Sequence, residues 1–147
     1  MYSYILVPHI IISILLLLVV LFVLIRSFLG IYSKVNFSKF IDINIPIFAV
    51  SLLYLELILG MMLYAIHINE LSTLVSQENA NSYFSARFWA VEHTILMMFA
   101  IVFGHLGLVY AKNLKENKAK FQKNFLYFGL TFLLIIFSVG MNMIRNG

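Results

Sequence analysis

The chain contains no cysteine among its 147 residues. It therefore cannot form disulfides, thiolate-held iron–sulfur clusters or thioether-linked haem, and it has no cysteine nucleophile. Charged residues are also scarce, at 11%, whereas hydrophobic residues make up 63% and the mean hydropathy is +0.99. A soluble domain is roughly half apolar and about one-quarter charged, so the composition predicts an integral membrane protein. No polar stretch is long enough to bury a core of its own, which predicts a single domain over residues 1–147.

Four apolar runs stand out along the sequence, and each has about the 20 residues that a helix needs to cross the hydrocarbon. They cover approximately residues 5–25, 45–66, 88–111 and 125–144. The runs lack the alternating pattern of barrel strands, and backbone groups in lipid must be satisfied within a helix or a closed barrel. The sequence therefore predicts an all-α, up-down bundle of four transmembrane helices that contacts the lipid bilayer.

The basic residues predict the orientation of this bundle. Three of the ten Lys and Arg lie in the first connection and five in the third, and cytoplasmic loops carry an excess of such residues. Both termini are then periplasmic, in the inner membrane of a bacterium. The net charge of +4 follows from this topology, so it does not predict nucleic-acid binding. No Lys or Arg precedes the first run and no small-residue cleavage site follows it, which predicts an uncleaved anchor.

Two histidines are predicted at the same depth. His9 lies four residues after the start of the first run and His93 five after the start of the third, about 6–8 Å inside the outer boundary at 1.5 Å per residue. These two helices run parallel and lie diagonally in an up-down bundle. Two imidazoles at one level are the axial ligands of a six-coordinate b-type haem. The alternative is that each histidine is interfacial or simply hydrogen-bonded.

Two more histidines allow weaker hypotheses. His105 lies twelve residues after His93, about 18 Å deeper and about 120° around the helix, so the two cannot share a ligand. A second, inner haem would use His105 with Tyr54, whose phenolate is a known type of haem ligand; the alternative is a hydrogen bond from His105 across helices. His67, at the outer end of the second helix, would bond a haem propionate or replace His9, unless it is an interfacial residue.

Other polar residues fit around such a site. Glu56 lies near the middle of the second helix, where a carboxylate must be protonated or paired, and it shares a face with Gly60 and His67. That stripe would form a proton or quinol path, with Gly60 leaving room for a flat ring, or Glu56 would make an interhelical hydrogen bond. Arg87 and Trp89, at the outer mouth, would hold propionates or anchor the interface.

The fourth helix has no ionisable group before Arg145. Its Gly129, Ser138, Gly140 and Asn142 suit close helix contact, so we interpret this helix as structural.

The segment Arg87-Phe-Trp-Ala-Val-Glu-His93-Thr-Ile-Leu-Met-Met98, with Glu56-Leu-Ile-Leu-Gly60-Met-Met-Leu-Tyr64 upstream, resembles a family of small four-helix, cytochrome b-like membrane proteins of Bacteroidetes-type bacteria. The resemblance spans most of the chain. It implies an outer haem on His9 and His93, and in relatives an inner haem between the position of His105 and a histidine on the second helix. This chain has Tyr54 at that position, and Glu56 where relatives have glutamine, so only the outer pair carries over.

These observations together predict a b-type haem membrane electron carrier that exchanges electrons with quinone or with a respiratory partner protein. One rival hypothesis is a haem-free structural or accessory subunit of a larger inner-membrane complex, in which the histidines act as polar links between helices. Another is a membrane oxidoreductase, such as the small four-helix protoporphyrinogen oxidases, but the motifs of that group are missing from the sequence.

Overall fold

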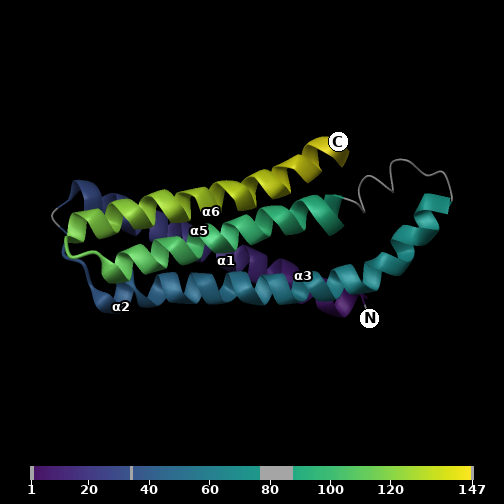
Figure 1. Cartoon of the computed structure of the whole chain (residues 1–147), viewed down its shortest axis with the longest axis horizontal. Helices are drawn as coiled ribbons and strands as arrows, with labels where there is room; N and C mark the ends of the chain where they lie inside the picture. Colours follow the sequence, from purple (N-terminus) through teal and green to yellow (C-terminus); the bar gives the residue numbers. More distant parts are fainter. Residues whose placement is uncertain (1, 34, 77–87, 147) are drawn as a thin grey trace.

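The computed structural model describes residues 2–33, 35–76 and 88–146; within these, the side chains of residues 2, 67–76, 89–90 and 142–146 lie outside the description. All regular structure in the described residues is helical. The elements are α1 (Tyr2–Tyr32), the short α2 (Lys39–Asp42), α3 (Asn44–Ser76), a π-helix η1 (Phe88–Glu92), α5 (His93–Asn113) and α6 (Asn117–Asn146) (Figure 1). The predicted all-α fold class is confirmed.

Four of these helices are long and apolar enough to cross a membrane. The candidate spans are Ser3–Tyr32, Lys39–Ile66, His93–Asn113 and Asn117–Met141. Each overlaps one of the four predicted runs, so the number and positions of the spans follow from hydropathy alone. These helices indicate a multi-pass membrane protein in contact with the lipid bilayer.

The helices extend beyond the apolar runs that predicted them. Helix α1 continues to Tyr32 and α6 begins at Asn117, each about two turns outside the predicted bounds. The two extensions pack on each other, because a Cβ atom at Gly30 would overlap the buried ring of Phe121. Hydropathy marks the hydrocarbon layer, whereas a helix continues for as long as its backbone stays hydrogen-bonded and one face stays packed.

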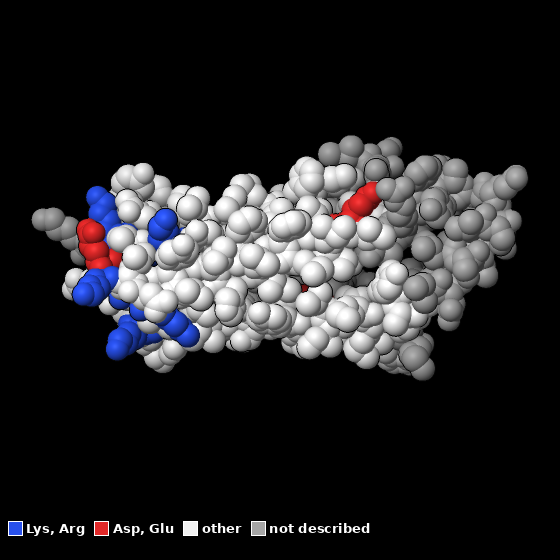
Figure 2. All heavy atoms as spheres, viewed as in Figure 1, with Lys and Arg blue, Asp and Glu red and all other residues white. Residues whose placement is uncertain are grey.

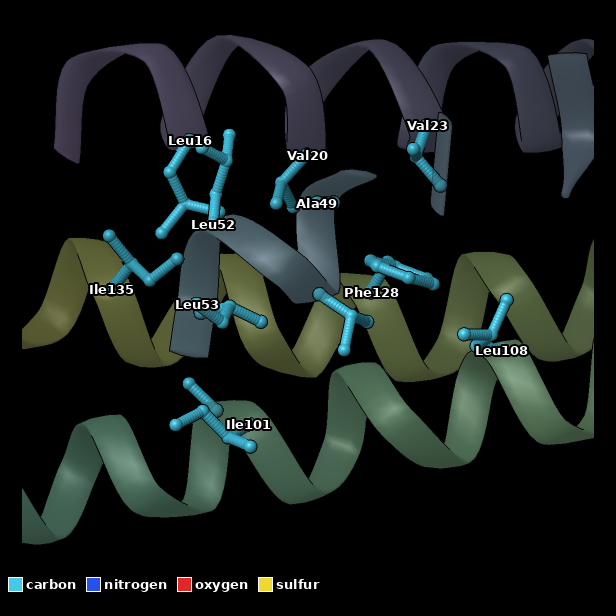
Figure 3. Close-up of a cluster of buried hydrophobic side chains, with 12 residues drawn as sticks. Leu16, Val20, Val23, Ala49, Leu52, Leu53, Ile101, Leu108, Phe128 and Ile135 are labelled. Carbon is cyan, nitrogen blue, oxygen red and sulfur yellow. The ribbon is translucent and has the colours of Figure 1, made fainter. Parts of the chain in front are cut away.

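The long helices form a four-cornered bundle around one apolar core. Helix α1 packs on α3 and α6, and α5 packs on the same two helices, so α1 and α5 occupy diagonal corners. Figure 3 shows core side chains from all four helices meeting between them. The labelled members are Leu16, Val20, Val23, Ala49, Leu52, Leu53, Ile101, Leu108, Phe128 and Ile135. This layer fills the middle of the bundle.

The described basic side chains are unevenly distributed along the bundle. On the face drawn in Figure 2, the described Lys and Arg side chains gather at the end where α1 leads into α2 and α5 into α6. Arg26 is paired there with the buried Asp42, through contacts of 2.8 Å and 3.1 Å, and Asp42 also accepts a hydrogen bond from the backbone N–H of Ser38. These bonds fix the start of α2 against α1 and leave no uncompensated charge on Asp42.

Candidate functional site

His9 and His93 face each other across the bundle. His9 lies on α1 and His93 is the first residue of α5. Their ring centroids are 6.3 Å apart and the ring planes are nearly perpendicular, at 82°. The structure thus brings together the two imidazoles that were predicted to lie at the same depth. They come from helices at diagonal corners of the bundle.

The His9 ring is held by a carboxylate from the neighbouring helix. Its Nδ1 lies 2.7 Å from Oε2 of Glu56 on α3, although the ring nitrogen is not aligned for a linear hydrogen bond. The same Oε2 accepts a hydrogen bond of 2.9 Å from the Ser13 hydroxyl, one turn further along α1. Glu56 is only 7% exposed, so its carboxyl group sits inside the bundle and joins α1 to α3. A carboxylate on the far nitrogen of a histidine is a common way to orient that ring.

The His93 ring is held from the opposite side. Its Nδ1 is hydrogen-bonded at 2.7 Å to the hydroxyl of Ser138, a fully buried residue of α6. The π-helix η1 ends at the residue before His93. Single π-helical turns are rare and are frequently found at functional sites.

A cavity of about 60 Å³ lies against both rings, and all four long helices contribute to its lining. Its walls are mainly apolar and include Gly60 and the thioether side chains of Met61 and Met97. A Cβ atom at Gly60 would lie 3.9 Å from Cε1 of His9, an ordinary van der Waals contact, so Gly60 lies beside the imidazole. The site therefore combines two imidazoles, one carboxyl group and two hydroxyls within an apolar enclosure.

The set of possible metal ligands is small. Among the described residues, no three histidine or acidic side chains come close enough together to hold a metal ion. Two imidazoles alone leave a tetrahedral zinc site half empty. They are, however, the complete protein contribution to a six-coordinate haem, whose macrocycle supplies the other four nitrogens.

Tyr54 and His105, the predicted inner pair, are both exposed on the outer surface of the bundle. No hydrogen bond or ring contact joins them. The side chains of His67 and Trp89, and the whole of Arg87, lie outside the described residues. The proposed roles of these three residues near the outer mouth therefore stay predictions.

Sequence reasoning did not find the partners of the two histidines. It predicted for Glu56 either a path shared with Gly60 and His67 or an interhelical hydrogen bond. The structure shows such a bond, from Ser13 of α1, beside a contact with His9 that was not predicted. Ser138 was interpreted only as a small packing residue of the fourth helix. A serine in an apolar helix gives no signal that separates close packing from a hydrogen bond to a distant residue, because both uses require the same small side chain.

Comparison of the chain with models of known families, with curated proteins and with solved structures finds no match. The resemblance to cytochrome b-like proteins therefore stays a prediction that rests on the residues around Glu56 and His93.

Proposed function

We propose that this chain binds one b-type haem between His9 and His93 and acts as an electron carrier of the membrane. The observation that carries the proposal is the spacing of the two rings. A metal ion lies about 2.0 Å from an imidazole nitrogen, and that nitrogen lies about 1.15 Å from the ring centre because the ring bonds are about 1.35 Å long. Two imidazoles whose nitrogens point at one metal from opposite sides thus have centroids about 6.3 Å apart. The observed distance is 6.3 Å.

The neighbours of the rings support the same role. Metal-binding histidines use one ring nitrogen for the metal, and the other nitrogen contacts a carboxylate, carbonyl or hydroxyl that fixes the ring. Glu56 and Ser138 occupy these positions at Nδ1 of His9 and of His93. Bound haem supplies a single-electron redox couple whose potential depends on its axial ligands and their hydrogen bonds. In this proposal Glu56 and Ser138 orient the ligands and tune that potential.

The two imidazoles suit a haem iron, but the cavity beside them is smaller than the haem macrocycle requires. A cavity of about 60 Å³ is well below the roughly 300–1,000 Å³ of typical small-molecule sites, so binding requires some lining side chains to move apart. The lining includes Met61, which is 59% exposed, and Met97. Unbranched thioether side chains adapt to new shapes more readily than branched ones, so these two residues are the ones we expect to move.

The proposed location is the inner membrane of a bacterium, in the up-down topology with both termini on the periplasmic side. The described Lys and Arg gather at one end of the bundle (Figure 2), as the positive-inside rule expects of a cytoplasmic end. The histidine pair lies toward the other end, in the outer part of α1 and α5. In this proposal the electron partner is a quinone or a respiratory protein.

A haem-free accessory subunit is the second candidate. The contacts of His9 with Glu56 and of His93 with Ser138 also give these polar groups partners without any metal. Buried polar side chains joined across helices contribute modestly to membrane-protein association. In this alternative the histidines hold the bundle together and the protein acts through its surface.

Optical spectroscopy of the purified protein, expressed with sufficient haem, distinguishes the two candidates. The carrier proposal expects a reduced-minus-oxidised spectrum of haem b with one haem per chain, lost in His93→Ala. The matched control is His105→Ala, which removes an exposed imidazole of the same helix and leaves haem content unchanged if only the outer site exists. A colourless wild-type protein would contradict the proposal and favour the accessory subunit, and loss of half the haem in the control would indicate an inner site.

A further inference from the structure

Two polar side chains lie on the lipid-facing surface of the bundle, far from either end. Tyr54 of α3 is 45% exposed and His105 of α5 is exposed as well. At 1.5 Å per residue, Tyr54 is about 15 Å from the start of α3 at Asn44, and His105 is about 12 Å from the end of α5 at Asn113. Hydrocarbon offers no partner to a phenol or an imidazole, so exposure at this depth is unfavourable in an isolated chain.

The two side chains also lie on the same side of the bundle. Gly104 of α5 faces α3, because a Cβ atom there would lie 3.0 Å from Cδ1 of Leu53. Tyr54 and His105 each follow one of these contacting residues by one position, which turns them about 100° around their helices. Helices α3 and α5 run in opposite directions (Figure 1), so these equal turns point toward one outer face. The geometry of the two helices thus puts a hydrogen-bond donor and an acceptor on one outer face at nearly the same depth.

The exposed residues around Tyr54 and His105 are apolar except for Lys112, near the end of α5. Other exposed residues of α3 and α5 fall within about 40° of Tyr54 or His105 on an ideal helix. We call this surface the α3–α5 face, and it consists of Ile47, Tyr54, Ile58, Met61, Ala65, Met98, His105, Val109 and Lys112. It is a surface that another membrane helix can cover, with two hydrogen-bonding groups at its centre.

We propose that a second copy of this chain covers the α3–α5 face, so that Tyr54 of each copy bonds to His105 of the partner subunit. Both copies insert in the same orientation, because their cations lie at the same end, and a two-fold axis along the membrane normal then keeps every residue at its own depth. A two-fold interface is reciprocal: if one residue contacts another across it, the converse contact is also made. Because Tyr54 and His105 lie at nearly the same depth, a single two-fold axis lets both Tyr54–His105 pairs of the dimer form hydrogen bonds.

This reciprocity is what favours a second copy over another partner. A different protein would have to present its own acceptor and donor at the same depth, and lipid tails would leave both groups without partners. The chain itself already carries the matching pair. The proposal concerns the outer surface of α3 and α5 and does not depend on whether His9 and His93 bind haem.

A double-mutant cycle on dimerisation tests the pairing. Donor- and acceptor-labelled copies are mixed in vesicles at varied protein-to-lipid ratios, and energy transfer gives the dimer dissociation constant. Each interhelical hydrogen bond in a membrane contributes about threefold on average, and two such bonds form per dimer. Tyr54→Phe and His105→Phe should therefore each weaken the dimer by about eightfold, and the double variant should be no weaker than either single one. Tyr110→Phe, an exposed tyrosine elsewhere on α5 that stacks on Tyr127, should have no effect.

Disulfide cross-linking gives a second readout that does not depend on the polar pair. Because the natural chain has no cysteine, Ile58→Cys is placed in one tagged copy and Met98→Cys in a differently tagged copy, and both are oxidised in native membranes. A disulfide between the two tags is expected. The control pair is Leu18→Cys with Leu133→Cys, two exposed residues of α1 and α6 that each lie twelve positions from the Gly30–Phe121 contact and so at equal depth.

Each outcome either supports or contradicts the proposed dimer. Cross-linking restricted to the α3–α5 pair, together with a non-additive cycle, supports the proposal. Equal cross-linking of the control pair, a monomeric chain at every protein-to-lipid ratio, or additive effects of Tyr54→Phe and His105→Phe would each overturn it. Haem content measured on the same variants stays at the wild-type value if the two sites are independent, so failure of the dimer does not imply failure of the haem site.

Discussion

Replacement of Glu56 measures how strongly the contacts of one buried carboxyl group hold α1 against α3. Oε2 of Glu56 contacts His9 at 2.7 Å and accepts a hydrogen bond from Ser13 at 2.9 Å, while its Oε1 has no hydrogen-bond partner among the described residues. Glu56→Leu removes both contacts and leaves the His9 Nδ1 beside the cavity without its carboxylate. Glu56→Gln keeps an acceptor and a donor of similar size at the same place.

The expected magnitude follows from these contacts. A buried polar group that loses its partner costs about 1–3 kcal/mol, but the Ser13 hydroxyl can turn to the carbonyl of its own helix, as serines in helices often do. Leucine also relieves the unfavourable burial of a carboxyl group. Since hydrogen bonds between membrane helices average about 0.6 kcal/mol and reach about 1.7, we expect Glu56→Leu to lower the free energy of unfolding by about 1 kcal/mol. Glu56→Gln should lower it by less than half of that.

Reversible unfolding in mixed micelles of mild detergent and dodecyl sulfate, followed by far-ultraviolet circular dichroism, measures these differences. Ser51→Ala is the matched control, because the Ser51 hydroxyl is exposed and bonds only to the Ile47 carbonyl of its own helix. It should leave stability unchanged. If Glu56→Leu proved as stable as the wild type or more so, the contacts of Glu56 with α1 would not stabilise the bundle, and the reasoning from their distances would be refuted.

Two further predictions concern packing and charge at the basic end. Gly30→Ala should lower the thermal midpoint of unfolding, since its methyl group would overlap the buried Phe121 ring and overpacking costs about 1–3 kcal/mol. The control Gly140→Ala, whose methyl group meets nothing within 4 Å, should be neutral. Equal midpoints for the two variants would contradict the close approach of α1 and α6. Asp42→Asn should destabilise the protein by about 1–3 kcal/mol in the same unfolding assay, because it weakens charged hydrogen bonds to Arg26, and an unchanged value would show that this pair is not needed to fix α2.

Hydropathy was sufficient to predict the helices but not their ends. The four runs lie where the candidate spans lie, because the free energy of moving apolar side chains into lipid depends on composition and length alone. Helix α3 continues to Ser76, ten residues past its predicted end. Helix ends depend on backbone hydrogen bonds and on packing partners such as Phe121, and neither is encoded in the average hydropathy of a window.

Residue depth predicted the histidine pair, whereas the partners of each histidine required coordinates. Counting residues from the helix starts placed His9 and His93 at one level, and their rings are 6.3 Å apart. The rotation of each helix about its axis decides that Glu56 meets His9 and that Ser138 meets His93. That rotation depends on how all four helices pack together, so no single-helix pattern contains it.

The two histidines are tied to different halves of the chain. His9 contacts α3 through Glu56, and His93 contacts α6 through Ser138. Helices α1 and α3 precede α5 and α6 in the sequence, so during synthesis the first pair can enter the bilayer and bring Glu56 to His9 before the second pair exists. Membrane helices form first and associate afterwards. The two imidazoles therefore oppose each other only when the pair α1 and α3 packs against the pair α5 and α6.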